Sequence, residues 1–544
     1  MTFEKRGQRI MKRTGSGKTG LVFLCTGIIP FCIIVCIGSV WASVETEDSR
    51  EQGLGRELVY LPAYRLAGKI RSGEITAVQA LEAYLHQISL YNPEINAIVT
   101  LDAEGARQRA READEALERG EVWGPLHGVP ITIKDNYATS SIRTTNSYPG
   151  LADYVPDFNA TVVEKMLQSG VVIIGKTNLP QLGMDYQTNS PVFGVTNNPW
   201  DLSRTPGGST GGGAAAVASF MSALSFGNDL GGSIRIPSHF CGIYGIKPTE
   251  NMVSKYGLNP GFPKTEFDSV HHLISCGPLA RSIEDLKICL KVIAGPDRKD
   301  EDVPDIPMIE SPKRDLGSLR IAWMDDFGGI PVSEETRSSL KKFTDSLAEK
   351  GCTVERTSPD DFNPREIWAT YGRIMDMEIG VYTPSFYRFL SFLFGGSYRK
   401  ATPFLEMVFP ITYEKYMKAL TQRDAQVSSM EGFLSEWDVW LCPVTSTPAY
   451  EHIEPDKYFG PYPLYDKPIM VDGEPVNYLM ANGAYTTIFN LTGSPVVIIP
   501  IGYTTEGLPI GVQIVGKRWR DMELLEIAAM LDEAAGAYSR PPGY

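Results

Sequence analysis

Two serines lie among glycines in the middle of the chain and are well suited to nucleophilic chemistry. Ser209 and Ser233 both belong to the small-residue stretch 207–237. Glycine permits tight backbone turns that a Cβ atom would block. The intervening residues predict a short helix over 214–219 and a short strand over 223–226, so we expect both serines at loop tips rather than in a core. A serine hydroxyl is a weak nucleophile by itself and needs a neighbouring base.

A lysine is the most direct candidate for that base. The chain has six histidines, and none stands in an obvious motif with an aspartate. Lys134 follows the apolar segment 129–133, whose β-branched residues predict a strand that delivers the lysine to the edge of a sheet. Lys134, Ser209 and Ser233 therefore form a candidate base, relay and nucleophile. Taken singly, these patterns are also typical of turn serines and of a solvated lysine at a strand end.

Three separated segments, in this order, resemble the amidase signature family. They are a lysine at a strand end, a Gly-Gly-Ser loop and a Gly-x-Asp-x-Gly-Gly-Ser-Ile-Arg segment, which occur here as Lys134, Gly207–Gly212 and Gly227–Arg235. Thr210 stands where the family commonly has a second serine. Because threonine keeps the hydroxyl, we expect its hydrogen bond to survive. The resemblance extends from about Leu58 to the C-terminus and is weakest over 360–437.

The resemblance implies a catalytic triad of two serines and a lysine. Ser233 would attack the amide carbonyl. Ser209, held by a cis peptide bond to Gly208, would pass the proton to Lys134 and later to the leaving amine. The oxyanion hole would consist of the backbone N–H groups of Leu230, Gly231, Gly232 and Ser233. Three residues are expected to support the site, namely Thr210 and an ion pair of Asp229 with Arg235, and no cofactor or metal is implied.

The proposed base must be neutral in order to accept a proton. Free lysine has a pKa of about 10.4, so it is almost wholly charged at neutral pH. Burial disfavours the ammonium form, and we expect it to bring the pKa of Lys134 to about 7–8. The carboxylate of the next residue, Asp135, would oppose this effect at close range. Strand alternation turns its side chain to the opposite face of the sheet.

The composition is that of a large globular protein. The 544 residues are 43% hydrophobic and 21% charged, with a net charge of −14. This acidic balance argues against nucleic acid as the main partner, because contacts to phosphate need basic patches. Helical segments alternate with short apolar strands, which favours a layered α/β fold. The resemblance implies a single large α/β/α catalytic domain around a mixed, twisted sheet over 57–544, and the oligomeric state is left open.

The N-terminus carries a candidate membrane segment. Residues 1–19 form a basic tail, and residues 20–42 are apolar and uncharged. That run is long enough to cross a bilayer, which takes about 20 residues. The basic tail predicts a cytoplasmic N-terminus, with the acidic linker 43–56 and the catalytic domain on the far side. The alternative is a signal peptide cleaved after Ala42, which would export the enzyme, although its apolar region would exceed the usual length of about 7–15 residues.

We expect an amidase that hydrolyses the C–N bond of a small-molecule carboxylic amide to an acid and ammonia or an amine, through an acyl-enzyme on Ser233. One alternative is the A-type subunit of a glutamine-dependent amidotransferase, which would act on a cytoplasmic acylated tRNA. The membrane segment and the acidic charge count against it. Another alternative is a non-catalytic, membrane-tethered binding protein, against which the intact triad argues. The pattern over 207–211 also matches the nucleophile elbow of α/β-hydrolases, which would need a later aspartate and histidine.

Two aromatic segments could contribute to a substrate site. Residues 384–394 contain four phenylalanines. These are typical of a packed helix, and alternatively of an acyl or aryl pocket or of a contact with the bilayer. Residues 458–465 are rich in proline and tyrosine, so we expect an irregular loop at the rim of the site.

Overall fold

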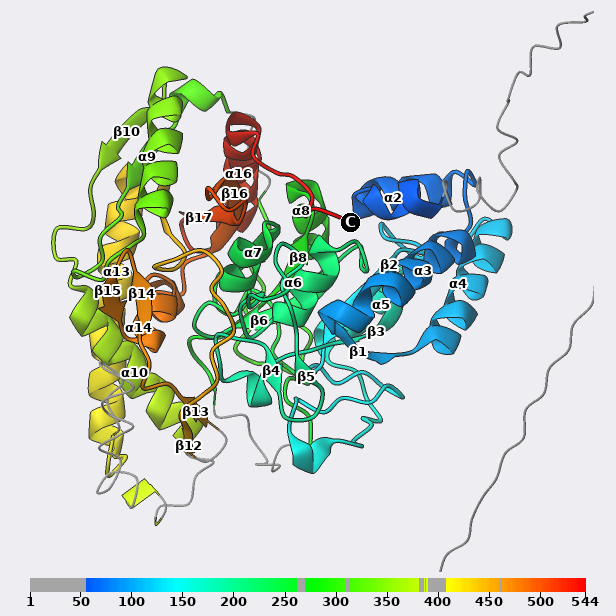
Figure 1. Cartoon of the computed structure of the whole chain (residues 1–544), viewed down its shortest axis with the longest axis horizontal. Coiled ribbons are helices and arrows are strands. Elements are labelled where there is room, and N and C mark those ends of the chain that lie inside the picture. The colour runs from blue at the N-terminus through cyan, green and yellow to red at the C-terminus, as the bar shows by residue number, and fades with distance from the viewer. Residues whose placement is uncertain are drawn as a thin grey trace, which may run out of the picture. The chain divides into compact units, whose positions relative to one another are not determined.

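A large mixed β-sheet forms the spine of the structure (Figure 1). The computed structural model describes residues 55–261, 270–309, 314–380, 386, 388, 389, 408–459 and 462–544, and all of them belong to one compact unit. Among these residues the sheet has eleven strands, in the order β1 (Ile98–Leu101), β3 (Val172–Thr177), β2 (Pro130–Lys134), β6 (Ser225–Asp229), β8 (Ser275–Ala280), β7 (Tyr244–Lys247), β16 (Val496–Tyr503), β17 (Pro509–Val515), β11 (Val439–Pro443), β9 (Arg320–Trp323) and β10 (Thr353–Arg356).

The pairing of β2 and β6 brings together the ends of two segments that are far apart in the sequence. β2 runs parallel to β3 and to β6, whereas β8 is antiparallel to β6. Both the expected α/β class and the mixed sheet are therefore confirmed. Parallel neighbours end at the same edge of a sheet, where α/β folds commonly build their sites. Lys134, the last residue of β2, accordingly lies beside the loop that follows Asp229, the last residue of β6.

Helices gather at both ends of the sheet and along it (Figure 1). The first four described helices lie near β1 and β3, whereas α10, α13 and α14 lie toward the β10 end. Their bounds are α2 (Ala63–Arg71), α3 (Ala77–Ile95), α4 (Ala103–Glu118), α5 (Thr161–Gln168), α6 (Gly211–Ala218), α7 (Arg235–Cys241), α8 (Ile283–Ile293), α9 (Glu334–Glu349), α10 (Pro364–Gly380), α13 (Tyr413–Glu436), α14 (Tyr478–Gly483), α15 (Thr487–Leu491) and α16 (Asp521–Ala535).

Two short helices, α6 and α7, are wholly buried and begin just after the two serines. α6 consists of glycine, alanine and one valine because its surroundings leave no room for larger side chains. A Cβ atom on Gly212 would lie 2.5 Å from the backbone nitrogen of Asn178 and 2.8 Å from the carbonyl oxygen of Ala97. The predicted order of loop, helix, strand and loop between the serines is found as α6 followed by β6.

Several predicted segments fall outside the described ranges. The tail 1–19, the apolar segment 20–42 and most of the linker 43–56 are among them. Within the described ranges, no helix is both long enough and apolar enough to cross a bilayer. Of the phenylalanine-rich segment 384–394, only Phe386, Arg388 and Phe389 are described, and both phenylalanines are exposed.

The proline-rich segment near residue 460 differs from the expectation. β12 (Lys457–Phe459) and β13 (Tyr462–Leu464) pair as an antiparallel two-stranded ribbon. The prediction of an irregular loop was therefore wrong. Proline is tolerated on the edge of a ribbon, because the N–H group that it lacks would not be needed by a neighbouring strand there. Pro463 lies opposite Tyr458 in this ribbon.

Candidate active site

Lys134 and Ser209 are in direct contact at the end of β2. The Lys134 Nζ atom lies 2.8 Å from Ser209 Oγ and 3.1 Å from Thr210 Oγ1. The lysine side chain is fully buried, and both hydroxyl residues are also buried. The structure thus brings together the predicted base, the predicted relay and the threonine that was expected to support them.

Burial lowers the pKa of Lys134 to about 7, against an ordinary value of 10.5. The negative charge of Asp229 partly opposes this shift. The carboxylate of Asp135 accepts hydrogen bonds from the backbone N–H and the hydroxyl of Thr145, and it is not among the groups that shift the pKa of Lys134. A substantial fraction of Lys134 is therefore neutral near pH 7, as a general base requires.

Geometry distinguishes Lys134 from two other buried lysines. Burial lowers the pKa of Lys176, which donates hydrogen bonds to the carbonyl oxygen of Tyr137 and to Thr139 Oγ1. Burial also lowers the pKa of Lys247 to about 7, and its ammonium group donates to the carbonyl oxygen of Pro248. A lowered pKa alone therefore does not identify a base in this protein. Contact with Ser209 sets Lys134 apart.

The backbone on either side of Ser209 is tightly constrained. The peptide bond between Gly208 and Ser209 is cis, as the resemblance implied. A side chain at Gly208 would collide with the chain opposite, since its Cβ atom would lie 2.6 Å from the carbonyl oxygen of Asp185. The N–H group of Thr210 donates to the carbonyl oxygen of Ser233 at 3.1 Å. This last bond ties the loops of the two serines together.

Both serines are more enclosed than the sequence suggested. They occupy loops, as predicted, but Ser209 is only 1% exposed and Ser233 only 7% exposed. The buried helices that follow them draw both loops into the interior. Among the described residues, no hydrogen bond joins the hydroxyl groups of Ser209 and Ser233. Catalytic hydrogen bonds are often long before substrate binds, and the expected proton path needs Ser233 Oγ to come within hydrogen-bonding distance of Ser209 Oγ.

The loop after β6 presents backbone N–H groups beside Ser233. Within the described ranges, the N–H groups of Leu230, Gly231 and Ser233 have no protein acceptor. Gly232 differs from the expectation, because its N–H group donates to Asp229 Oδ1 at 2.8 Å. Three of the four N–H groups expected to form the oxyanion hole therefore have no acceptor among the described residues.

Asp229 and Arg235 form the expected ion pair, and both side chains are fully buried. Two bonds join them, from Arg235 Nε to Asp229 Oδ2 at 3.0 Å and from Nη2 to Oδ1 at 2.8 Å. The guanidinium charge and the hydrogen bonds hold the pKa of Asp229 below its ordinary value, despite the opposing effect of burial. The carboxylate also accepts from the N–H groups of Gly232 and Ile234. The pair therefore fixes the loop that carries Ser233.

Other residues at the site come from distant parts of the chain and were not predicted. The hydroxyl of Tyr371, on α10, donates to the carbonyl oxygen of Leu230 at 3.0 Å. The hydroxyl of Tyr186 donates to the carbonyl oxygen of Gly231 at 3.3 Å, and Thr486 Oγ1 donates to the same atom at 2.6 Å. No local sequence pattern identifies these side chains, because their partners are backbone atoms of another segment.

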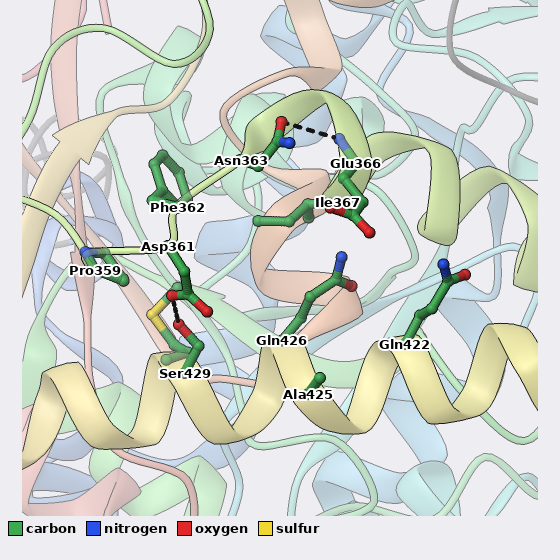
Figure 2. Close-up of a pocket in the computed structure, with 11 residues that line it drawn as sticks. Pro359, Asp361, Phe362, Asn363, Glu366, Ile367, Gln422, Ala425, Gln426 and Ser429 are labelled. Atoms are coloured by element: carbon green, nitrogen blue, oxygen red, sulfur yellow. Dashed lines mark hydrogen bonds between the residues drawn. The ribbon is translucent and has the colours of Figure 1, made fainter.

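A separate pocket of about 170 Å³ lies between the start of α10 and the middle of α13 (Figure 2). Its lining includes Asp361, Glu366, Gln422 and Gln426, and Asp361 accepts a hydrogen bond from Ser429. It contains none of the residues predicted from the sequence to act in catalysis. Over the described part of the chain, no group of three or more potential ligands could hold a metal ion.

Comparisons with known proteins agree with this arrangement. The model of the family described as "Amidase" matches residues 79–525. The A subunit of glutamyl-tRNA(Gln) amidotransferase from Carboxydothermus hydrogenoformans is 34% identical over 499 residues, covering 88% of this chain and 98% of that protein. The corresponding subunit from Thermoanaerobacter pseudethanolicus is 32% identical over 516 residues, covering 89% and 98%.

Solved structures show the same fold. A 6-aminohexanoate cyclic dimer hydrolase in complex with its substrate is 28% identical, with a TM-score of 0.72, covering 89% of this chain and 99% of that one. A fatty acid amide hydrolase is 22% identical, with a TM-score of 0.73, covering 89% and 86%. The latter likeness is one of fold alone.

Proposed function

Because the chain belongs to the amidase signature family, we propose that it hydrolyses the C–N bond of a small-molecule carboxylic amide through an acyl-enzyme on Ser233. The observation that carries this proposal is the 2.8 Å contact between Lys134 Nζ and Ser209 Oγ. It lies in a buried site where the pKa of the lysine falls to about 7. A buried amine of that pKa, in contact with a serine hydroxyl, is a base matched to neutral pH.

Acylation begins when Ser233 Oγ attacks the amide carbonyl carbon. The proton of Ser233 passes to Ser209 Oγ while Ser209 gives its own proton to Lys134 Nζ. The negative charge on the carbonyl oxygen is stabilised by the N–H groups of Leu230, Gly231 and Ser233, which are free to donate in the described structure. Preorganised donors of this kind each contribute about 10²–10³ in rate.

Collapse of the tetrahedral intermediate breaks the C–N bond. Lys134 returns the proton through Ser209 to the nitrogen, so ammonia or an amine leaves and the acyl group remains as an ester of Ser233. Water then attacks this ester, with its proton following the same path to the lysine. Lys134 then returns the proton through Ser209 to Ser233 Oγ as the ester bond breaks, which releases the carboxylic acid and restores both the serine hydroxyl and the neutral base.

Hydrolysis is tested with purified protein and a panel of short aliphatic, aromatic, peptide and long-chain acyl amides. We expect turnover of at least one class, an acyl adduct on Ser233 detected by mass spectrometry, and no turnover by Ser233→Ala. The melting temperature of this variant should match that of the wild type. Retained hydrolysis in Ser233→Ala, or an adduct at another residue, would contradict the assignment of the nucleophile.

A second candidate function is release of ammonia from glutamine for transfer to another substrate. The curated relatives named as amidotransferase A subunits favour it. The two functions differ in their substrates. Ammonia release from L-glutamine, with no turnover of any other amide in the panel, would favour transfer over general hydrolysis. Turnover of either kind would exclude a non-catalytic binding protein.

We also propose that residues 20–42 anchor the protein in a membrane with the catalytic domain on the side opposite the basic tail. Support comes from the uncharged apolar run and from the basic residues before it. Membranes from cells that produce the full chain are washed with alkaline carbonate. Retention with an intact N-terminus supports an anchor, whereas full release with an N-terminus that starts after Ala42 favours a cleaved signal peptide.

A further inference from the structure

Each of the three N–H groups near Ser233 that lack a protein acceptor belongs to a peptide unit whose carbonyl oxygen accepts a hydrogen bond. The carbonyl oxygen of Asp229 accepts from Asn490 Nδ2 at 3.0 Å, and that of Gly232 accepts from the N–H group of Ile236 at 2.8 Å. The carbonyl oxygen of Leu230 accepts from the Tyr371 hydroxyl at 3.0 Å. These peptide units supply the N–H groups of Leu230, Ser233 and Gly231, respectively.

A peptide unit is planar, and in a trans unit the C=O and N–H bonds point in opposite directions. Holding the carbonyl oxygen therefore sets the direction of the N–H group of the next residue. For the unit between Leu230 and Gly231, the Tyr371 hydroxyl is the hydrogen-bond donor to the carbonyl oxygen. Gly231 has no side chain to restrict its backbone dihedral angles, so the orientation of this peptide unit depends strongly on that hydrogen bond.

The neighbouring peptide unit, between Gly231 and Gly232, is held at both ends. Its carbonyl oxygen accepts from Tyr186 and from Thr486, and its N–H group donates to the carboxylate of Asp229. This unit is thus rigid, but its N–H group is not available to a substrate. The two tyrosines therefore have different roles, although their hydroxyl groups would lie within 3.0 Å and 3.2 Å of the same Cβ atom on Gly231.

We propose that Tyr371 is a positioning residue that aims the Gly231 N–H group at the oxyanion through the carbonyl oxygen of Leu230. The side chain is only 5% exposed. The helix that carries it, α10, is fixed next to the site because Trp368 Nε1 donates to the carbonyl oxygen of Ala484 at 3.0 Å. A helix from the region of weakest family resemblance thus controls one donor of the oxyanion hole.

This inference rests on the proposed amide hydrolysis and is tested with Tyr371→Phe, which removes one hydroxyl from a buried ring. We expect kcat to fall about 10- to 100-fold, somewhat less than the loss from deleting a donor, with little change in KM. A trifluoromethyl ketone that forms a tetrahedral adduct with the serine should bind more weakly by the same factor. The acid limb of the pH–rate profile should stay in place, because Lys134 is untouched.

Tyr485→Phe is the matched control. The Tyr485 hydroxyl is also buried and donates to a backbone carbonyl, that of Ile330 at 2.6 Å. Both substitutions should lower the melting temperature to a similar extent, and only Tyr371→Phe should lower kcat. Tyr186→Phe should cost less activity than Tyr371→Phe, because Thr486 still holds the carbonyl oxygen of Gly231.

Hydrogen exchange gives a readout that does not require turnover. In Tyr371→Phe the peptide that contains residues 230–233 should exchange faster, since the loop loses an anchor, whereas Tyr485→Phe should leave it unchanged. Wild-type kcat and unchanged exchange in Tyr371→Phe would overturn the inference. A loss of activity accompanied by a shifted acid limb would also overturn it, by locating the effect at the lysine. An inactive wild type would refute the proposed function, and exchange alone would then decide the role of Tyr371.

Discussion

Replacement of Thr210 by valine should lower the pKa of Lys134 further. The lysine Nζ atom donates to Thr210 Oγ1 at 3.1 Å as well as to Ser209 Oγ. Valine has nearly the shape of threonine but offers no acceptor. The charged ammonium depends on that acceptor more than the neutral amine does, because hydrogen bonds to charged groups are the stronger ones. Its loss therefore disfavours protonation of the lysine.

The size of the effect follows from the difference between the two kinds of hydrogen bond. A bond that involves a charged group contributes about 1.5–3 kcal/mol, and a neutral bond about 0.5–1.5 kcal/mol. The protonated form thus loses about 1–1.5 kcal/mol more than the neutral form, and one pKa unit corresponds to about 1.4 kcal/mol. From a wild-type pKa of about 7, the lysine of Thr210→Val should titrate about one unit lower.

The assay is the pH dependence of kcat/KM between about pH 5 and 9, which reports the ionisation of the free enzyme. Activity should fall as the pH drops through about 7 in the wild type, because Lys134 becomes protonated. In Thr210→Val this fall in activity should occur about one pH unit lower. The control variant Thr210→Ser keeps the hydroxyl and should behave like the wild type. If the acid limb of the Thr210→Val pH profile stays in place or moves to higher pH, the reasoning is refuted.

Three further predictions concern the buried charges and the oxyanion loop. Lys134→Met should be inactive but more stable than the wild type near pH 7. The folded lysine loses its proton above about pH 7, whereas the unfolded lysine keeps it to about pH 10.4, so the contribution of Lys134 to wild-type stability rises by about 1.4 kcal/mol per pH unit in this window. The gap in melting temperature between Lys134→Met and the wild type should therefore narrow as the pH rises. Asp229→Asn should lower the free energy of unfolding by about 3–5 kcal/mol, measured by denaturant titration, because Arg235 loses its buried partner. Gly231→Ala should lower kcat, since its Cβ atom would lie 3.0 Å from the Tyr371 hydroxyl, and an unchanged kcat would contradict the close packing there.

The sequence predicted the parts of the site that depend on local geometry. Glycines around Ser209 and Ser233 indicated loops, and the β-branched residues before Lys134 indicated a strand end that would turn Asp135 away from it. These signals are readable because turns and strand alternation depend on neighbouring residues. The α/β class followed from the same local patterns.

Tertiary structure decided what depends on residues far apart in the chain. The pKa of Lys134 results from its burial in the folded protein. The Asp229 carboxylate that accepts from the Gly232 N–H group also accepts from Asn490 Nδ2, far along the chain. Tyr371 reaches the carbonyl oxygen of Leu230 from a helix well over a hundred residues later. A hydrogen bond to a backbone atom leaves no pattern at the position of its acceptor, because every residue there has the same carbonyl group. The types of the reacting groups were therefore visible in the sequence. The directions in which the backbone N–H donors point became visible only once the chain was folded.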